Sequence, residues 1–164
     1  MIKLNLLNKK NAGFTLIELL IVIAIFSTLI GISTISLSNL IPTASFATGS
    51  QSIVSDLKSQ QFNAMTGNTS GSGDGSSYGI YLESDQYTLF TGSAYNPSAT
   101  DNFVIKLPAT NTITNINFST NSIVFLQNSG EISGFNPTAA SFQLQSNSGK
   151  VETYNFNKLG VITE

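Results

Sequence analysis

Few side chains in this sequence could take part in catalysis. The 164 residues include no His, Cys or Trp, and every cation is a Lys. Without His there is no imidazole base and no Ser-His-Asp triad, and without Cys there is no thiolate nucleophile, disulfide or cysteine zinc site. The missing Arg removes the usual planar reader of phosphate and guanine. Composition therefore argues against most hydrolytic, redox and nucleic-acid chemistry.

The acidic residues do not form a catalytic or metal-binding pattern either. Glu83 and Asp85 are two residues apart, and we interpret them as solvated groups beside a turn. Asp74 is the one carboxylate in the Gly/Ser-rich segment 67–77, far fewer than an EF-hand requires, so we interpret it as part of a solvated turn. The sequence thus predicts no catalytic residue, no metal site and no cofactor.

Glu18 differs from the other acids because it lies at the edge of a long apolar run. Residues 19–37 carry no charge, and no cation lies between Lys10 and Lys58. A carboxylate at the centre of a bilayer costs about 2.5–3.5 kcal/mol on insertion scales, and less near an interface. Such a group usually has a cationic partner, and the neighbouring sequence offers none.

The apolar run predicts a membrane-spanning helix. Nineteen residues of helix extend roughly 28 Å, close to the ~30 Å hydrocarbon thickness of a bilayer. Before the run, the chain carries Lys3, Lys9 and Lys10 and no acid. Cations on this side of a span hold it in the cytoplasm, so the rest of the chain is expected outside.

A signal peptide or a plain anchor would also contain such a run. A secretory signal peptide would end in a pair of small residues at its cleavage site, and no clear A-x-A site follows this run. A plain N-terminal anchor would need nothing beyond the apolar length. A lipoprotein is excluded because it would need a Cys.

The residues around Glu18 resemble the class III signal of type IV prepilins and type II secretion pseudopilins. In this sequence a basic leader ends at Gly13 and continues as Phe14-Thr15-Leu16-Ile17-Glu18-Leu19-Leu20. The resemblance implies that a membrane prepilin peptidase cuts between Gly13 and Phe14 and N-methylates Phe14. It also implies that Glu18 neutralises the N-terminal amine of a neighbouring subunit during filament assembly.

Physical chemistry gives this motif a rationale. Glycine before the cut lets extended backbone enter a protease cleft without a side-chain clash. The cut removes Lys3, Lys9 and Lys10 and creates an α-ammonium at Phe14, which supplies the cation that Glu18 lacks. A dry ion pair is not necessarily a net gain, because both groups lose water. We therefore expect the pair to set the register between subunits.

A second helical segment is expected after the span. Pro42 should kink or end the helix there. Beyond it, a helical apolar stripe runs to Met65, before Gly67, and consists of Phe46, Ile53, Val54, Leu57, Ala64 and Met65. The predicted organisation is a leader (1–13), a membrane and assembly helix (14–41), an amphipathic continuation (42–66), a flexible loop (67–77) and a β-rich domain (78–164).

Short alternating segments predict strands in the last part. Tyr78–Leu82 and residues 86–90 flank a hairpin turn, and further strands are expected at 103–107, 113–118, 122–126, 141–145, 150–156 and 159–162. One helix followed by seven or eight strands indicates an α+β fold, in which a long N-terminal helix packs on a C-terminal antiparallel β-sheet domain.

These segments also show a looser resemblance to H-type minor pseudopilins and similar minor pilins. The resemblance rests on Tyr78-Gly79-Ile80, on Phe118 with Ile123–Phe125 and Gly130, and on the terminal Leu159-Gly160-Val161-Ile162. It implies a non-enzymatic subunit of a type II secretion pseudopilus or type IV pilus-like filament. Its expected partners are the prepilin peptidase, other pilins, an inner-membrane assembly platform and membrane lipid.

Three rival functions remain: a minor pilin of a competence or DNA-uptake pilus, a membrane-anchored extracytoplasmic binding module, and an anchored enzyme, the least favoured. Residues 14–164 contain four Lys and nine acids, a side-chain charge of −5. Electrostatic capture of nucleic acid by this chain is therefore disfavoured. The expected location is the cytoplasmic membrane with the N-terminus inside, and then a filament.

Overall fold

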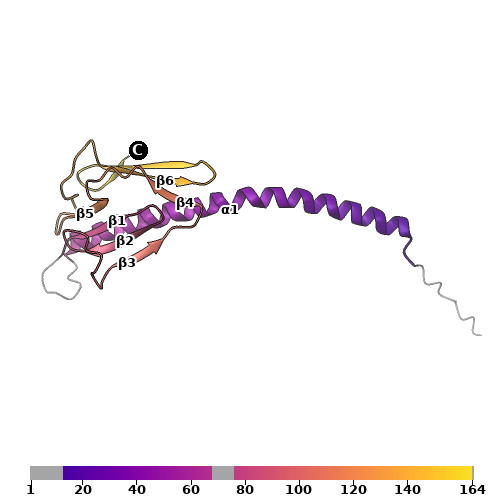
Figure 1. Cartoon of the computed structure of the whole chain (residues 1–164), viewed down its shortest axis with the longest axis horizontal. Coiled ribbons are helices and arrows are strands. Elements are labelled where there is room, and N and C mark those ends of the chain that lie inside the picture. The colour runs from indigo at the N-terminus through magenta and orange to yellow at the C-terminus, as the bar shows by residue number, and fades with distance from the viewer. Residues whose placement is uncertain (1–12, 68–75, 164) are drawn as a thin grey trace, which may run out of the picture. The chain divides into compact units, whose positions relative to one another are not determined.

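A computed structural model describes residues 13–67 and 76–163, except the side chains of residues 34–43. Lys3, Lys9, Lys10, most of the predicted 67–77 loop and Asp74 lie outside the described residues. The chain divides into two compact units with the boundary between Asn39 and Leu40. Helix α1 (Leu16–Thr66) contributes to both units, and all the strands belong to the second (Figure 1).

Both ends of α1 follow from local sequence signals. At its start the Glu18 N–H donates to the Thr15 hydroxyl (3.3 Å), so Thr15 is the N-cap. At its end Gly67 takes a φ of +63° and its N–H donates to the Ala64 carbonyl (3.3 Å). Glycine favours this left-handed position because it has no Cβ to clash. The predicted end before Gly67 is confirmed.

Pro42 does not end the helix, so that part of the prediction is wrong. The backbone remains helical through this position, from Leu16 to Thr66. Proline inside a helix costs about 3 kcal/mol because it lacks an N–H and crowds the preceding turn. Its φ is nevertheless fixed near the helical value, so the turns on either side can retain their own hydrogen bonds.

The second unit contains two antiparallel sheets where the sequence suggested one. Sheet A has the strand order β3-β2-β1-β5, and sheet B has the order β4-β6-β7-β8. Sheet A consists of β1 (Tyr78–Leu82), β2 (Gln86–Thr91), β3 (Phe103–Lys106) and β5 (Ser122–Phe125). Sheet B consists of β4 (Asn111–Thr114), β6 (Ser141–Ser146), β7 (Val151–Phe156) and β8 (Ile162–Thr163). The predicted α+β class is confirmed.

The predicted hairpin at 83–85 is present, with Leu82 paired to Tyr87 and Tyr78 to Thr91. Two predicted strands differ from the observed ones by more than one residue at an end. β4 ends at Thr114 because Asn115 takes a φ of +50°, which the extended conformation of a strand does not allow. β8 begins only at Ile162, since Gly160 turns the chain with a φ of +75°.

One core joins the helix to both sheets. The predicted apolar stripe of α1 supplies Phe46, Ile53, Leu57 and Ala64 as fully or almost fully buried residues, and Val54 packs against them. Met65 is the exception, at 52% exposed. Buried strand residues of the same core come from sheet A (Tyr78, Ile80, Leu82, Tyr87, Ile123, Phe125) and from sheet B (Ile113, Phe142, Leu144, Tyr154, Phe156).

Candidate processing and assembly site

The first turn of α1 combines two stabilising signals. Thr15 and Glu18 stand three residues apart, which is the spacing of a capping box, and the Thr15 hydroxyl accepts the Glu18 N–H. Glu18 also lies in the first turn, where the helix dipole favours a negative charge. Sequence reasoning missed this capping role, although the T-x-x-E pattern was its signal.

Gly13 and Phe14 lie directly before the cap and are not helical. Phe14 is 86% exposed, and a Cβ placed on Gly13 would meet nothing within 4 Å. The bond between them is therefore in an open, irregular segment, a form in which a protease can bind a substrate backbone. The leader lysines that precede it lie outside the described residues.

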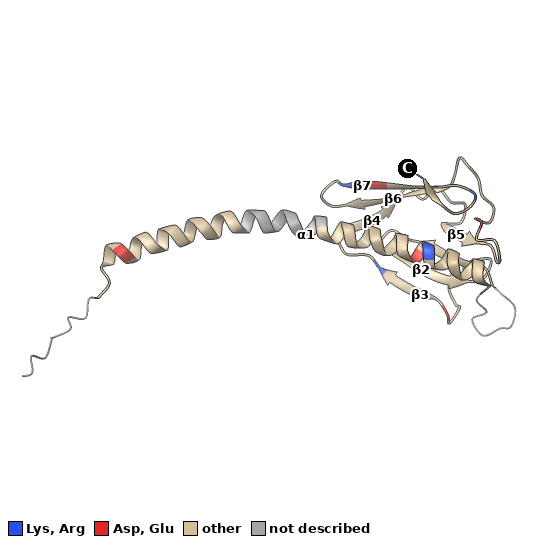
Figure 2. Cartoon of the chain, turned by 180° about the vertical axis from the view of Figure 1, so that it is seen from behind, with Lys and Arg blue, Asp and Glu red and all other residues tan. Residues whose placement is uncertain are grey.

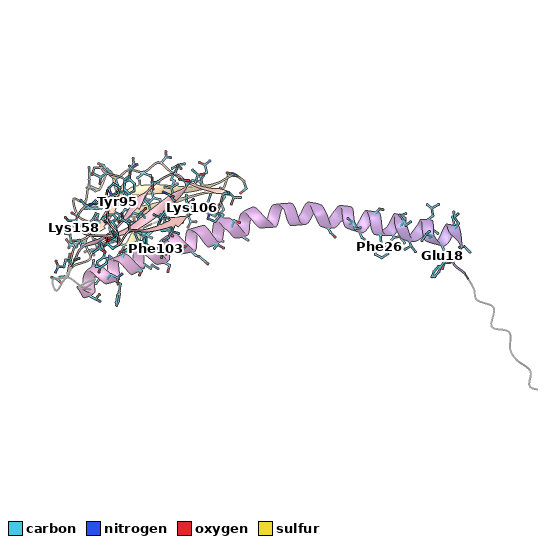
Figure 3. All side chains as sticks on the ribbon, turned by 60° about the horizontal axis from the view of Figure 1, so that its bottom comes forward. Glu18, Phe26, Tyr95, Phe103, Lys106 and Lys158 are labelled. Atoms are coloured by element: carbon cyan, nitrogen blue, oxygen red, sulfur yellow. The ribbon has the colours of Figure 1, made fainter. Side chains whose placement is uncertain are left out.

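The helix that follows is long and apolar enough to cross a membrane. Leu16–Ser33 has a mean hydropathy of 2.5, and none of this window is buried within the chain. Figure 3 labels Glu18 and Phe26 on this part of α1. Phe26 is 60% exposed and Ile32 is 68% exposed, so these apolar side chains need lipid or other helices around them.

Two of the hydroxyls inside this window bond to the helix itself. Thr28 donates to the Ile25 carbonyl (2.8 Å), and Ser33 donates to the Leu29 carbonyl (2.9 Å). Such bonds hide polar groups that would otherwise be unsatisfied in hydrocarbon. Glu18 is the one ionisable side chain between Gly13 and Ser33.

In the second unit, polar contacts fix α1 to both sheets. From sheet A, the Tyr87 hydroxyl donates to the Asp56 carboxylate (2.6 Å) and lies 3.1 Å from the Ser52 hydroxyl. From sheet B, the Tyr154 hydroxyl donates to the Ser50 hydroxyl (2.9 Å). Sequence reasoning did not single out these residues, because a local pattern does not reveal partners 31 and 104 positions apart.

Burial changes the acidity of both tyrosines. Desolvation raises the pKa of Tyr154 from 10 to about 12, with a smaller contribution from the nearby Glu152 charge. The pKa of Tyr87 is raised further, first by burial and then by its hydrogen bond to Asp56. Both phenols therefore stay neutral at ordinary pH and act as hydrogen-bond donors that hold the helix against the sheets.

One cavity of the second unit has no acid–base group among its lining residues. It is a groove of about 600 Å³ lined by hydroxyls, amides and apolar groups, including Ser122, Asn117, Phe118 and Phe135. Glu83 lies elsewhere and accepts a hydrogen bond from Gln86 Nε2 (2.7 Å) beside the β1–β2 turn. Glu83 thus contributes to local structure, and the groove offers uncharged hydrogen-bonding chemistry.

Charged residues of both signs occur on several elements of the second unit (Figure 2). Among the described residues, no group of three or more Asp, Glu, His or Cys side chains is arranged to hold a metal ion. One ion pair, Lys158 Nζ to Glu131 Oε2 at 3.2 Å, joins two of the surface charges.

Among comparisons with known proteins, one family model matches the N-terminal region of the chain. Residues 8–34 match the model of the prokaryotic N-terminal methylation motif. No curated protein and no solved structure matches the chain. The chain thus carries the class III signal of type IV pilins and pseudopilins, which implies processing by a prepilin peptidase.

The matched motif lies at the start of a chain that has a pilin-like α+β fold. Its apolar N-terminal helix is consistent with a location in the membrane or a filament.

Proposed function

We propose that this chain is a structural, non-enzymatic minor pilin or pseudopilin. It inserts with its N-terminus in the cytoplasm, is cut between Gly13 and Phe14, and is N-methylated at Phe14. An inner-membrane assembly platform then draws it into a type II secretion pseudopilus or type IV pilus-like filament. The observation that supports this proposal most is the exposed apolar helix, which has a single acid in its first turn and lies within the matched motif up to residue 34.

The geometry of the first turn supports the role of Glu18. After the cut, the new ammonium belongs to Phe14, directly before the N-cap, where the positive end of the helix dipole disfavours a cation. A carboxylate from a neighbouring subunit would relieve this repulsion. That carboxylate is the neighbour's Glu18, which lies in the first turn of its helix, close in depth to the ammonium. A subunit at the wrong height would leave one charge unpaired in an apolar environment, so the pair sets the axial register.

The capping box makes a sharper test possible than removal of the side chain. Glu18→Gln keeps a residue that suits the capping box but removes the charge. We expect Glu18→Gln to insert in the membrane and lose incorporation into filaments. Thr15→Ala removes the cap hydroxyl and keeps the charge, and we expect it to assemble. Normal assembly of the Gln variant would contradict the charge-pairing role.

A membrane-anchored extracytoplasmic binding module is the rival function that one observation favours. The 600 Å³ groove with its hydroxyls, amides and aromatic side chains is large enough for a small uncharged ligand. A module of this kind would need the apolar helix only as an anchor, so it would tolerate Glu18→Gln without loss of function. A competence-pilus role fits the same signal, and neighbouring genes for secretion, retraction or competence components would separate it from the H-type pseudopilin.

A further inference from the structure

The 600 Å³ groove of the second unit has a polar lining that contains no charged side chain. Five of its lining residues carry hydroxyls: Ser93, Ser119, Thr120, Ser122 and Ser133. A charged ligand would lose water in this groove without meeting an opposite charge, which is costly. A neutral ligand with many hydroxyls would exchange its bonds to water for bonds to these side chains. The lining therefore favours a neutral, polar ligand.

Two asparagines of the groove are oriented by the protein and keep hydrogen-bonding capacity for a ligand. The Asn136 Oδ1 atom accepts the Thr138 N–H (3.1 Å) and the Thr138 hydroxyl (2.9 Å), which leaves the Asn136 Nδ2 group as a donor. Asn117 Nδ2 donates to the Ser141 hydroxyl (3.3 Å), which leaves the Asn117 Oδ1 atom as an acceptor. The groove thus presents both a fixed donor and a fixed acceptor.

Aromatic rings and free hydroxyls lie next to each other in this lining. Phe118 and Phe135 are partly buried, whereas Ser119 and Ser133 are exposed. Within residues 13–67 and 76–163, the hydroxyls of these two serines form no hydrogen bond. A sugar ring has an apolar C–H face and hydroxyls around its edge. An aromatic ring packs against such a face while neighbouring polar groups bind the hydroxyls.

A second hollow extends the groove along the surface. It has a volume of about 270 Å³ and shares Ser93, Thr120, Ser122 and Val124 with the groove. Its lining adds Tyr81 and Tyr95, whose rings stack with their centroids 4.1 Å apart (Figure 3 labels Tyr95). Two adjoining hollows that each contain aromatic rings and hydroxyls fit a ligand of repeated units, so an oligosaccharide is favoured over a single sugar.

An extended peptide is a poorer fit to this groove. Peptides often add a strand to a free sheet edge, where main-chain groups give most of the affinity. Here the edge of β5 is already occupied, because the Ser133 N–H donates to the Val124 carbonyl (2.8 Å) and the Leu126 N–H donates to the Glu131 carbonyl (2.8 Å). Recognition in the groove therefore depends on side chains, as it does for a sugar.

We propose that this groove binds a short neutral oligosaccharide. Phe118 and Phe135 pack against the C–H face of a sugar ring, and Asn117, Ser119 and Ser133 bind its hydroxyls. The proposal goes beyond the proposed function, because this binding requires neither cleavage after the leader nor assembly into a filament.

Binding is tested with the purified full-length chain in a detergent whose headgroup is not a sugar, since a sugar headgroup would compete for the groove. The probes are neutral trisaccharides of glucose, galactose, mannose and N-acetylglucosamine, with trigalacturonate as a charged trisaccharide and tetra-alanine as a peptide. Calorimetry and ligand-observed NMR measure their affinities. We expect at least one neutral trisaccharide to bind, and trigalacturonate and tetra-alanine to show no binding.

A pair of serine substitutions locates the site. Ser119→Ala combined with Ser133→Ala removes two free hydroxyls from the groove, and we expect about a five- to fiftyfold loss of affinity. Ser59→Ala combined with Ser84→Ala removes two exposed hydroxyls outside the groove and should leave the affinity unchanged. Equal urea unfolding midpoints for the two variants would show that the loss does not come from unfolding.

Three results would overturn the proposal: no binding of any neutral trisaccharide at millimolar concentration, equal or tighter binding of trigalacturonate or tetra-alanine, or unchanged affinity in the groove variant. None of these bears on the proposed function. Failure of that function would appear as a mature chain that does not begin at Phe14, or as filament assembly that is insensitive to Glu18→Gln.

Discussion

The Tyr87 hydroxyl donates a 2.6 Å hydrogen bond to the Asp56 carboxylate, and this bond fixes strand β2 to helix α1. Tyr87 is fully buried, whereas Asp56 is only partly buried. A bond of this kind is stronger than a neutral one because the acceptor is ionised. It holds this part of α1 in a defined position on sheet A.

Removal of the Tyr87 hydroxyl should therefore destabilise the second unit. We expect Tyr87→Phe to lower the free energy of unfolding by about 1–2 kcal/mol, because Asp56 loses a buried donor. Urea unfolding of the full chain in detergent measures this. Tyr154→Phe is the matched control, since its partner Ser50 is neutral, and it should cost about 1 kcal/mol or less. A larger loss for Tyr154→Phe than for Tyr87→Phe would contradict this ranking.

Stability should fall at alkaline pH. The pKa of Tyr154 is raised from 10 to about 12, and that of Tyr87 is also raised. Above pH ~10 the unfolded chain releases phenolic protons that the folded chain retains, so the free energy of unfolding decreases as pH rises. We expect no contribution of these groups to the pH dependence from neutral pH to about 9, and a loss as pH approaches 12.

Phenolate absorbance during an alkaline titration checks this expectation. Two of the five tyrosines should resist ionisation until the chain unfolds. A variant with both Tyr87→Phe and Tyr154→Phe should show a shallower alkaline loss of stability than the wild type. Equal slopes for the two proteins would show that other groups cause the loss.

The close approach of β1 to its neighbours gives a further prediction. A Cβ on Gly79 would lie 2.4 Å from Phe90 Cζ and 2.9 Å from the Ile123 carbonyl oxygen. The ring could shift, but the backbone oxygen belongs to the paired strand β5 and cannot move freely. We expect Gly79→Ala to destabilise the unit by roughly 1–3 kcal/mol. Gly134 has open space around it, but its φ of +62° makes Gly134→Ala a test of backbone strain alone.

Local patterns predicted the helix and most of the strands. The apolar run is recognised by its length, the stripe from Phe46 to Ala64 repeats with helical spacing, and residues 141–145 alternate as a strand does. These patterns involve residues that are close together in the chain, so they can be recognised without the structure. The T-x-x-E cap at Thr15 and Glu18 belongs to the same class and could have been recognised.

The division into two sheets could not be predicted in this way. β1 pairs with β5 across more than thirty intervening residues, and β4 pairs with β6 although β5 lies between them in the chain. Short strands carry little information about such distant partners. Asn115 is similar, because asparagine tolerates a positive φ without requiring it, so the early end of β4 has no clear sequence signal.

The N-terminal methylation motif was recognised because its information is local. Gly13, Phe14 and Glu18 occupy fixed positions relative to a basic leader and an apolar run, and residues 8–34 match the methylation motif. Exposed surfaces and pockets carry no such pattern. Only the folded unit shows that Phe103 is exposed on an edge strand and that Lys58 belongs to a pocket.

N-terminal sequencing with mass spectrometry of the mature protein, isolated from cells that contain the prepilin peptidase, tests the processing claim most directly. We expect a chain that begins at N-methylated Phe14 and retains the whole apolar helix. Gly13→Leu should leave the protein uncut in the membrane, because a side chain at that position obstructs entry to the protease cleft. A wild-type protein that still begins at Met1, or that begins beyond Leu37, would contradict processing as a pilin-like subunit.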